Sequence, residues 1–268
     1  MADEKGLMQR YSIVHPLYLS FFSKSLYQDV ARNWKGLCLT YLFALLALSV
    51  IPGVMKIRTN LINFFNTEAP GFVKQMPTIT VKDGKVSINK PQPYYIRDEK
   101  TDKAVMIIDT TGKVTSLSHS PAVVLVTKTS VILKTDENKA RTFDLSDVKS
   151  LVVTRRVIYD WMDGFQDWSA FIFYPLALFF SFIYHIIEVL FYAAVGLIFA
   201  RSLQTRLPFT SVVRLAVIAM TPSVILGTLL AILQIGVPYW WYVSLIISTV
   251  YVYFAVRANS GKESPSIA

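Results

Sequence analysis

Four long apolar stretches dominate the pattern of hydrophobic and polar positions along this chain of 268 residues. Each is close to or longer than the roughly twenty residues that a helix needs to cross a hydrocarbon core about 30 Å thick. The expected helices cover residues 36–56, 170–200, 209–233 and 238–256. The pattern therefore predicts an α-helical polytopic membrane protein with four transmembrane helices, the last three lying within residues 169–257.

A polar insert separates the first apolar stretch from the other three. Residues 57–168 are rich in Lys, Asp, Thr and Pro, whereas residues 170–256 contain only four charged side chains. Strand-like alternation around turn residues predicts three hairpins in the insert, over residues 78–88, 105–117 and 123–134. We therefore expect a small antiparallel β domain inserted between helices 1 and 2.

The pattern changes from strand to helix near residue 146. Ser146 to Lys149 resembles a helix start, and apolar residues recur at helical intervals from Leu151 to Met162. We expect an amphipathic helix that ends the domain and leads into the second span. Three aspartates on it either bind a divalent cation or, the favoured interpretation, form a solvent-facing surface: Asp160, Asp163 and Asp167.

An amphipathic pattern also precedes the first span, in the N-terminal segment of residues 1–35. Its apolar residues at helical spacing are Leu19, Phe22, Leu26 and Val30. Charged residues, Asp29 among them, are expected on other faces. The pattern indicates either a helix in the membrane interface or a helix packed on the protein's own cytoplasmic surface, and both place Trp34 at the depth of the lipid headgroups.

Basic residues in the short connections favour one orientation in the membrane. Those expected on one face are Lys24, Arg32, Lys35, Arg201, Arg206, Arg257 and Lys262. Because short cytoplasmic loops are enriched in Lys and Arg, we expect both termini, including the tail of residues 258–268, in the cytoplasm. Residues 57–168 then lie outside a bacterial cytoplasmic membrane, although Lys56 and Arg58 argue the other way.

Charge and cysteine content limit the partners. The net charge is +9, but Lys and Arg alternate with Asp and Glu and form no dense run, which argues against nucleic-acid binding. Cys38 is the only cysteine, so neither an intramolecular disulfide nor a cysteine zinc site is expected. The expected partners are membrane lipid and a membrane or envelope protein, and the oligomeric state is left open.

Ionisable side chains inside the apolar stretches are the main candidates for chemistry. Glu188 and His185, three residues apart, share a helix face in the second stretch, where a charged group is costly enough to suggest function. Arg214 is the expected partner, although it lies roughly 9 Å from the helix end and Glu188 roughly 18 Å. A structural ion pair is favoured over a proton or substrate relay, and two ligands are too few for zinc.

Pro222 interrupts the third stretch, between Thr221 and Ser223. Proline removes a backbone donor and breaks or kinks a helix. The favoured consequence is close packing, and the alternative is a polar cavity lined by hydroxyl groups. No nucleophile elbow, phosphate loop or metalloprotease helix is present, so we expect no catalytic site, no metal and no cofactor.

Several short motifs carry a family resemblance: Trp34-Lys35-Gly36, Asp83-Gly84, Pro93-Tyr94-Tyr95-Ile96, Ile108-Asp109-Thr110-Thr111-Gly112, and the stretch from Arg214 to Thr221-Pro222. With the topology, they make the chain similar to bacterial domain-of-unknown-function family 1189, some members of which are labelled maltodextrin-utilisation proteins. The resemblance implies four spans, an extracytoplasmic insert and a distant relation to the Yip superfamily. It implies no established reaction.

Two functions from different classes follow. The first is a non-enzymatic scaffold or accessory subunit whose extracytoplasmic β domain binds an envelope or transporter protein. The alternative is transport or lipid handling through the helical bundle, with Glu188 and His185 as a titrating pair and Pro222 as the flexible point. An enzymatic role has no support beyond that buried acid and imidazole.

Overall fold

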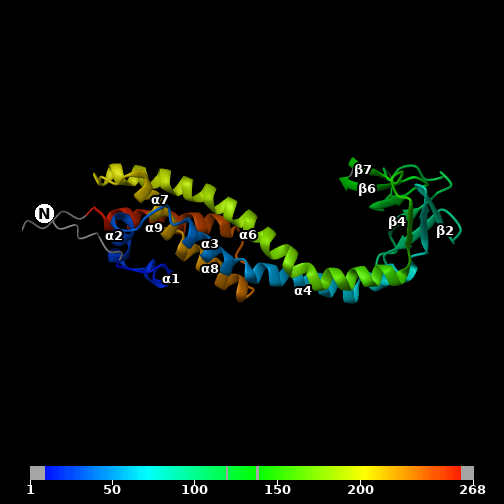
Figure 1. Ribbon diagram of the computed structural model, residues 1–268, viewed down its shortest axis with the longest axis horizontal. Helices are drawn as coiled ribbons and strands as arrows, with labels where there is room; N and C mark the ends of the chain where they lie inside the picture. Colours follow the sequence, from blue (N-terminus) through cyan, green and yellow to red (C-terminus); the bar gives the residue numbers. More distant parts are fainter. Residues whose placement is uncertain (1–9, 119, 137–138, 261–268) are drawn as a thin grey trace, which may run out of the picture. The chain divides into compact units, whose positions relative to one another are not determined.

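The computed structural model describes residues 10–118, 120–136 and 139–260 (Figure 1). The chain divides into two compact units, one of residues 1–56 with 170–268 and one of residues 57–169. We call these the helical unit and the β unit. The expected cytoplasmic segments at the two ends of the chain lie partly outside the described residues.

Six helices belong wholly to the helical unit: α1 (Pro16–Leu19), α2 (Lys24–Arg32), α3 (Leu39–Ser49), α7 (Phe209–Ala219), α8 (Thr221–Ile232) and α9 (Trp240–Ala258). Two more, α4 (Ile51–Thr67) and α6 (Arg155–Ser202), contribute residues to both units. By length and composition, four helical stretches are able to cross a membrane: Leu39–Thr67, Arg155–Ser202, Phe209–Ile232 and Trp240–Ala258. The prediction of four long apolar helices is confirmed.

The helix boundaries differ from those expected. The first apolar helical stretch continues to Thr67, well beyond residue 56, and α6 begins at Arg155 rather than Ala170. The expected bounds were placed where the apolar composition ends. A helix ends only where its backbone hydrogen bonding stops, and the polar residues next to these bounds continue it. The uninterrupted second helix was correctly predicted: α6 has 48 residues and passes through Pro175.

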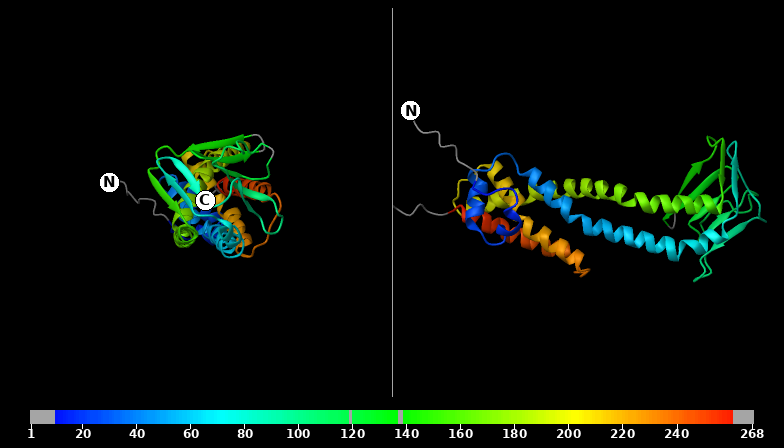
Figure 2. Two further views of the ribbon diagram at one scale, coloured as in Figure 1. Left: turned by 90° about the vertical axis from the view of Figure 1, so that its right-hand side faces the viewer. Right: turned by 60° about the horizontal axis from the view of Figure 1, so that its bottom comes forward.

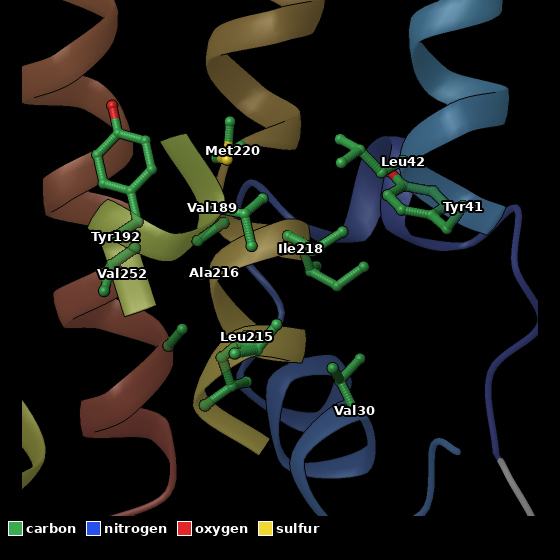
Figure 3. Close-up of a cluster of buried hydrophobic side chains, with 14 of the residues drawn as sticks. Val30, Tyr41, Leu42, Val189, Tyr192, Leu215, Ala216, Ile218, Met220 and Val252 are labelled. Carbon is green, nitrogen blue, oxygen red and sulfur yellow. The ribbon is translucent and has the colours of Figure 1, made fainter. Parts of the chain in front are cut away.

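The core of the helical unit surrounds α7 (Figure 3). Every side chain from Leu215 to Met220 is at most 1% exposed. Val189 and Tyr192 of α6 and Val252 of α9 belong to the same cluster, and α2 lies beside α7 and α9 in Figures 1 and 2. α7 contributes more buried side chains to this cluster than any other described helix, so α7 is the centre of this unit.

A glycine lets α6 approach this core closely. A β-carbon added at Gly196 would lie 2.8 Å from Cγ1 of Val212 on α7 and 3.3 Å from Cγ1 of Val252 on α9. Small residues allow the backbones of membrane helices to come near each other, where van der Waals packing holds them. Gly196 thus marks the contact of three helices.

The β unit contains α5 (Ala69–Gln75) and eight strands: β1 (Ile79–Lys82), β2 (Lys85–Ile88), β3 (Tyr94–Arg97), β4 (Ala104–Ile108), β5 (Val124–Val126), β6 (Ser130–Asp136), β7 (Lys139–Asp144) and β8 (Ser150–Val153). One sheet has the order β2-β1-β8, and the other has the order β3-β4-β5-β6-β7. All pairs are antiparallel except β4 with β5. The β domain is therefore present, as two sheets rather than a purely antiparallel set.

Two of the three expected hairpins are confirmed. β1 and β2 pair around Asp83 and Gly84, which have φ angles of 47° and 74° as a tight turn requires, and β5 pairs with β6. The hairpin over residues 105–117 is wrong, because β4 pairs in parallel with β5 instead. Asp109, 1% exposed, accepts hydrogen bonds from Thr111 and from the backbone N–H of Val114, which holds residues 109–114 as a loop.

The helix expected from residue 146 begins later. Residues 150–153 form β8, which pairs with β1, and α6 starts at Arg155. The β-branched residues Val152, Val153 and Thr154 favour extended backbone. The hydroxyl of Thr154 then accepts a hydrogen bond of 3.3 Å from the N–H of Val157 and helps to start the helix.

The close contact at Gly196 predicts a packing defect on substitution. Gly196→Leu is expected to lower the free energy of unfolding by roughly 1–3 kcal/mol, because the added side chain meets α7 and α9. Thermal unfolding of the purified protein in detergent measures this. Gly53→Leu is the matched control, since a β-carbon at Gly53 meets no atom within 4 Å; equal destabilisation by both substitutions would contradict the assigned contact.

Candidate functional site

Glu188 and His185 lie on one face of α6, as their spacing predicted. His185 Nε2 is 3.8 Å from Glu188 Oε2, and the hydroxyl of Tyr184 donates a hydrogen bond of 3.0 Å to Glu188 Oε1. The side chains of His185 and Glu188 are 19% and 24% exposed. Both groups that contact the carboxylate belong to the same helix, so these contacts do not link α6 to another helix.

Arg214 does not pair with Glu188, contrary to the expected ion pair. Its Nη2 donates to the carbonyl oxygen of Ala31 at 3.0 Å and to the hydroxyl of Ser211 at 2.7 Å. The Ser211 hydroxyl also donates to Ala31 at 2.7 Å. Carbonyl groups in the last turn of a helix attract basic side chains. Arg214 therefore connects α7 to the end of α2 and does not contact Glu188.

Pro222 lies just after a break in the third apolar stretch. α7 ends at Ala219 and α8 begins at Thr221, with Met220 between them. Thr221 and Ser223 are 0% and 2% exposed. The Thr221 hydroxyl bonds to that of Tyr41 on α3, and the Ser223 hydroxyl bonds to that of Ser248 on α9, both at 2.8 Å. Paired hydroxyl groups in a packed core fit the interpretation that the segment around Pro222 is closely packed, rather than the alternative of a polar cavity.

The most highly connected acidic side chain of the helical unit is Asp29 on α2, which the sequence pattern had assigned to an outer face. It is 5% exposed. Its carboxylate accepts hydrogen bonds from four donors: the N–H of Arg10 (3.1 Å), the N–H of Tyr11 (3.2 Å), Asn33 Nδ2 (2.7 Å) and Trp34 Nε1 (2.9 Å). Asp29 therefore fixes both the segment before α1 and the turn after α2.

These contacts set the protonation state of Asp29. Burial alone raises the pKa of the carboxyl group, but the four hydrogen bonds favour the charged form and together hold the pKa below its ordinary value. Only Arg10 among the four donor residues carries a charge, and it donates through its backbone. Asp29 is thus a structural anion satisfied by neutral donors.

The interfacial helix expected over residues 16–34 takes a different form. Leu26 and Val30 of α2 are 0% exposed and pack in the helical core, so α2 follows the alternative of packing on the protein itself. Trp34 is also buried, at 6% exposed, rather than at a surface. The sequence contained one signal for the burial of Asp29. Asp29 follows Leu26 by three residues, and this spacing puts its carboxylate on the same, buried face of α2.

The β unit presents one long open strand edge. β7 is the outer strand of the five-stranded sheet, and all six of its residues are exposed. The other edge strands are covered or short. At the opposite edge of the same sheet, the side chain of Gln75 bonds to both the N–H and the carbonyl of Arg97 in β3. In the smaller sheet, the N–H of Val86 in β2 bonds to the carbonyl of Lys128, and the outer strand β8 has only four residues.

The backbone direction along β7 follows from its neighbours. The N–H of Leu145, the residue after β7, donates to the carbonyl of Thr129, the residue before β6. The N–H of Lys134 in β6 donates to the carbonyl of Val123, on the side of β6 that faces β5 and not β7. Because backbone groups alternate along an antiparallel ladder, the N–H groups of Arg141 and Phe143 point to β6, and that of Thr142 points outward. No backbone hydrogen bond in the described part of the chain joins this outer edge.

Side chains beside this edge combine positive charge with apolar surface. Arg141 pairs with Leu133, and Phe143 pairs with Val131 across the ladder, so these four share one face. Phe143 is 50% exposed and Leu133 36% exposed. A strand edge with a basic and aromatic face is suited to an extended segment of another polypeptide.

No group of three or more His, Cys, Asp and Glu side chains among the described residues lies in a position to hold a metal ion. Asp160, one of the three aspartates considered for a cation, has an oxygen 4.0 Å from Nε of Arg156.

The fold defines a class of protein with four apolar helices of membrane-spanning length and a separate β unit that follows the first of them. The chain belongs to the family described as protein of unknown function DUF1189, whose model matches residues 14–256. It is also 26% identical over 123 residues to the uncharacterized protein RP489 of Rickettsia prowazekii (strain Madrid E), a match that covers 41% of each chain. No solved structure matches.

The hydrogen bonds of Asp29 predict a pH-dependent effect of Asp29→Asn. Because the folded-state pKa is depressed, the carboxylate stabilises the helical unit above the unfolded pKa of about 3.9, and this stabilisation is lost as the pH falls through the folded-state pKa. At pH 7 the variant is expected to lose about 1–3 kcal/mol, since four donors lose a charged acceptor.

Thermal unfolding in detergent between pH 7 and 3 checks this. The difference between the native protein and Asp29→Asn should shrink below about pH 4. Asp163→Asn, at an exposed position on α6, is the control for the change in charge and should leave the unfolding temperature unchanged. A difference that stays constant with pH would contradict the assigned role of the carboxylate.

Proposed function

We propose that this protein is an integral membrane scaffold or accessory subunit, and that its β unit binds a partner protein by strand addition at β7. The helical unit anchors the chain in the bacterial cytoplasmic membrane, with both termini in the cytoplasm. The β unit then lies outside, where an envelope or transporter protein reaches it. The distribution of Lys and Arg in the short connections supports this orientation.

The open edge of β7 is the observation that carries the proposal. An exposed strand edge promotes association between chains, and natural proteins commonly cover, shorten or charge such edges. Here β3 is covered by Gln75, whereas β7 extends for six residues with its outward N–H and carbonyl groups free for pairing. Its length suits the main-chain hydrogen bonding of an added strand.

The side chains beside β7 specify the kind of partner. Lys139 and Arg141 are exposed and basic, and Phe143 is exposed and apolar. The complementary partner is an extended segment in which acidic residues face the two cations and an apolar residue covers Phe143. A distant relation to the Yip superfamily, inferred from the sequence, is in keeping with such a non-enzymatic role in membrane organisation.

Thr142→Pro tests strand addition directly. The substitution removes the outward N–H of Thr142 but none of the N–H groups that bond to β6, and proline is tolerated on an edge strand in this position. We expect affinity purification from native membranes to recover the partner with the native chain and to lose it with Thr142→Pro. Deletion of residues 70–145 should have the same effect on recovery.

Thr142→Val is the matched control, because valine keeps the N–H and the extended conformation. It should recover the partner as well as the native chain does. Protease resistance of the β unit checks that Thr142→Pro remains folded. Unchanged recovery with a folded Thr142→Pro chain would overturn strand addition, and loss of self-association by that variant in size-exclusion chromatography would assign the edge to a second copy instead.

Transport or lipid handling through the helical unit is the second candidate. It is favoured by the position of Glu188, whose contacts with Tyr184 and His185 come from one helix while Arg214 is engaged with α2. A carboxyl group inside an apolar segment is costly, and for this reason it is a candidate for a proton or substrate pathway.

This candidate predicts that Glu188→Gln abolishes proton-coupled flux in reconstituted vesicles without lowering the amount of protein in the membrane. Glutamine keeps the size of the side chain and removes the titration. Tyr184→Phe is the control, because it removes the hydrogen bond to Glu188 and leaves the carboxylate. Misfolding of Glu188→Gln, or flux equal to that of the native chain, would exclude the relay.

A further inference from the structure

A cavity of 1120 Å³ lies in the helical unit where the chain passes from α2 to α3. Its lining comes from residues 10–13, from His15 and from residues 33–41. The hydrogen bonds to Asp29 hold the two sides of this cavity, since they reach Arg10 and Tyr11 on one side and Asn33 and Trp34 on the other. The cavity is therefore part of the folded structure of this segment.

The charged groups in the lining are basic, and the other titratable groups there are the phenols of Tyr11 and Tyr41, the imidazole of His15 and the thiol of Cys38. Arg10, His15 and Lys35 line the cavity, Arg10 and Lys35 are exposed, and no acidic residue is among the lining residues. Nη1 of Arg214 lies 3.5 Å from the carbonyl oxygen of Gly36, so another cation stands beside the cavity wall. The carboxylate of Asp29 also stands behind the wall, bonded to four lining residues, so Arg10, Lys35, Arg214 and Asp29 together leave a net charge of +2 in and beside the cavity. The cavity therefore favours an anion.

The same wall has an apolar border. Ile13 and Leu37 line the cavity and are 47% and 41% exposed. Val14 follows Ile13 in the chain and is 58% exposed, and Tyr18, whose ring centre is 6.0 Å from that of His15 in the lining, is 54% exposed. Further along the same segment, Phe22 is 65% exposed. Exposed apolar side chains beside basic ones are typical of a surface that lies in the membrane interface. The cavity thus combines a place for an anionic group with a surface for hydrocarbon.

We propose that this cavity binds the headgroup of an anionic phospholipid. Arg10 and Lys35 contact the phosphate, and the acyl chains lie against the exposed apolar residues from Ile13 to Phe22. The first turn of α3, whose N-cap residue Cys38 makes no capping side-chain bond, borders the cavity and adds backbone donors to the basic side chains.

A free phosphate accounts for only half of these features. It would satisfy the basic groups but leave the apolar border in water, whereas a phospholipid covers both. The position of the cavity at the start of the first apolar helix also suits a lipid, because Lys35 lies four residues before Leu39, where that segment begins. The proposal rests on the membrane location given above but not on strand addition at β7.

The test uses the full chain purified in a neutral detergent. Binding of phosphatidylglycerol is measured by native mass spectrometry and by the shift in unfolding temperature, with phosphatidylcholine of the same acyl chains as the zwitterionic comparison. Arg10→Gln combined with Lys35→Gln is expected to weaken phosphatidylglycerol binding roughly thirtyfold, since each basic group near an anionic lipid contributes about 1 kcal/mol and about 1.4 kcal/mol corresponds to tenfold. Both side chains are exposed, so the fold is kept.

Arg201→Gln combined with Arg206→Gln is the matched control, because it removes the same charge from exposed positions outside the cavity. This pair should retain native binding. Equal loss in both pairs, or equal binding of the two lipids, would overturn the proposal. A full stabilising shift with inorganic phosphate alone would overturn the lipid assignment in favour of a soluble phosphate. Because no partner protein is present, a failed strand-addition experiment leaves this result unaffected.

Discussion

The helical unit depends on the enclosure of the second half of α7. The side chains from Leu215 to Ala219, and that of Met220 just after the helix, are apolar and almost fully buried, so neighbouring helices cover every side of this segment. In lipid, close fit rather than the removal of apolar surface from water holds helices together. Gly196 provides that fit by letting α6 approach Val212 and Val252, and for this reason one small residue affects the contact of three helices.

Polar contacts then fix how the helices and the N-terminal segment are joined to this core. Tyr41 with Thr221, and Ser223 with Ser248, connect α8 to α3 and α9 near the break before Pro222. Asp29 joins the residues before α1 to those after α2, and Arg214 joins α7 to α2. These contacts engage Arg214, and the polar groups that contact Glu188 in the described part of the chain, Tyr184 and His185, belong to its own helix. The segment that Asp29 organises is also the one that forms the basic cavity.

The sheet order determines which part of the β unit is free to bind. β4 pairs with β5 in parallel, which places β6 and then β7 at the end of the larger sheet. α5 covers the opposite end through Gln75. An open edge therefore results from the connectivity of the strands, and no residue of β7 by itself indicates it. The proposed partner and the proposed lipid use different units of the protein.

Local pattern alone determined the four apolar helices, the hairpins around residues 83–84 and 127–130, and the shared face of His185 and Glu188. These features follow from residue composition, turn chemistry and helical spacing, which act over a few residues. Only the tertiary structure decided that Asp29 bonds to the backbone of Arg10 and Tyr11, that Arg214 bonds to Ala31, and that β4 pairs with β5 rather than with residues 113–117. Each of these contacts joins segments whose approach depends on the packing of the whole unit, and local periodicity contains no information about that approach.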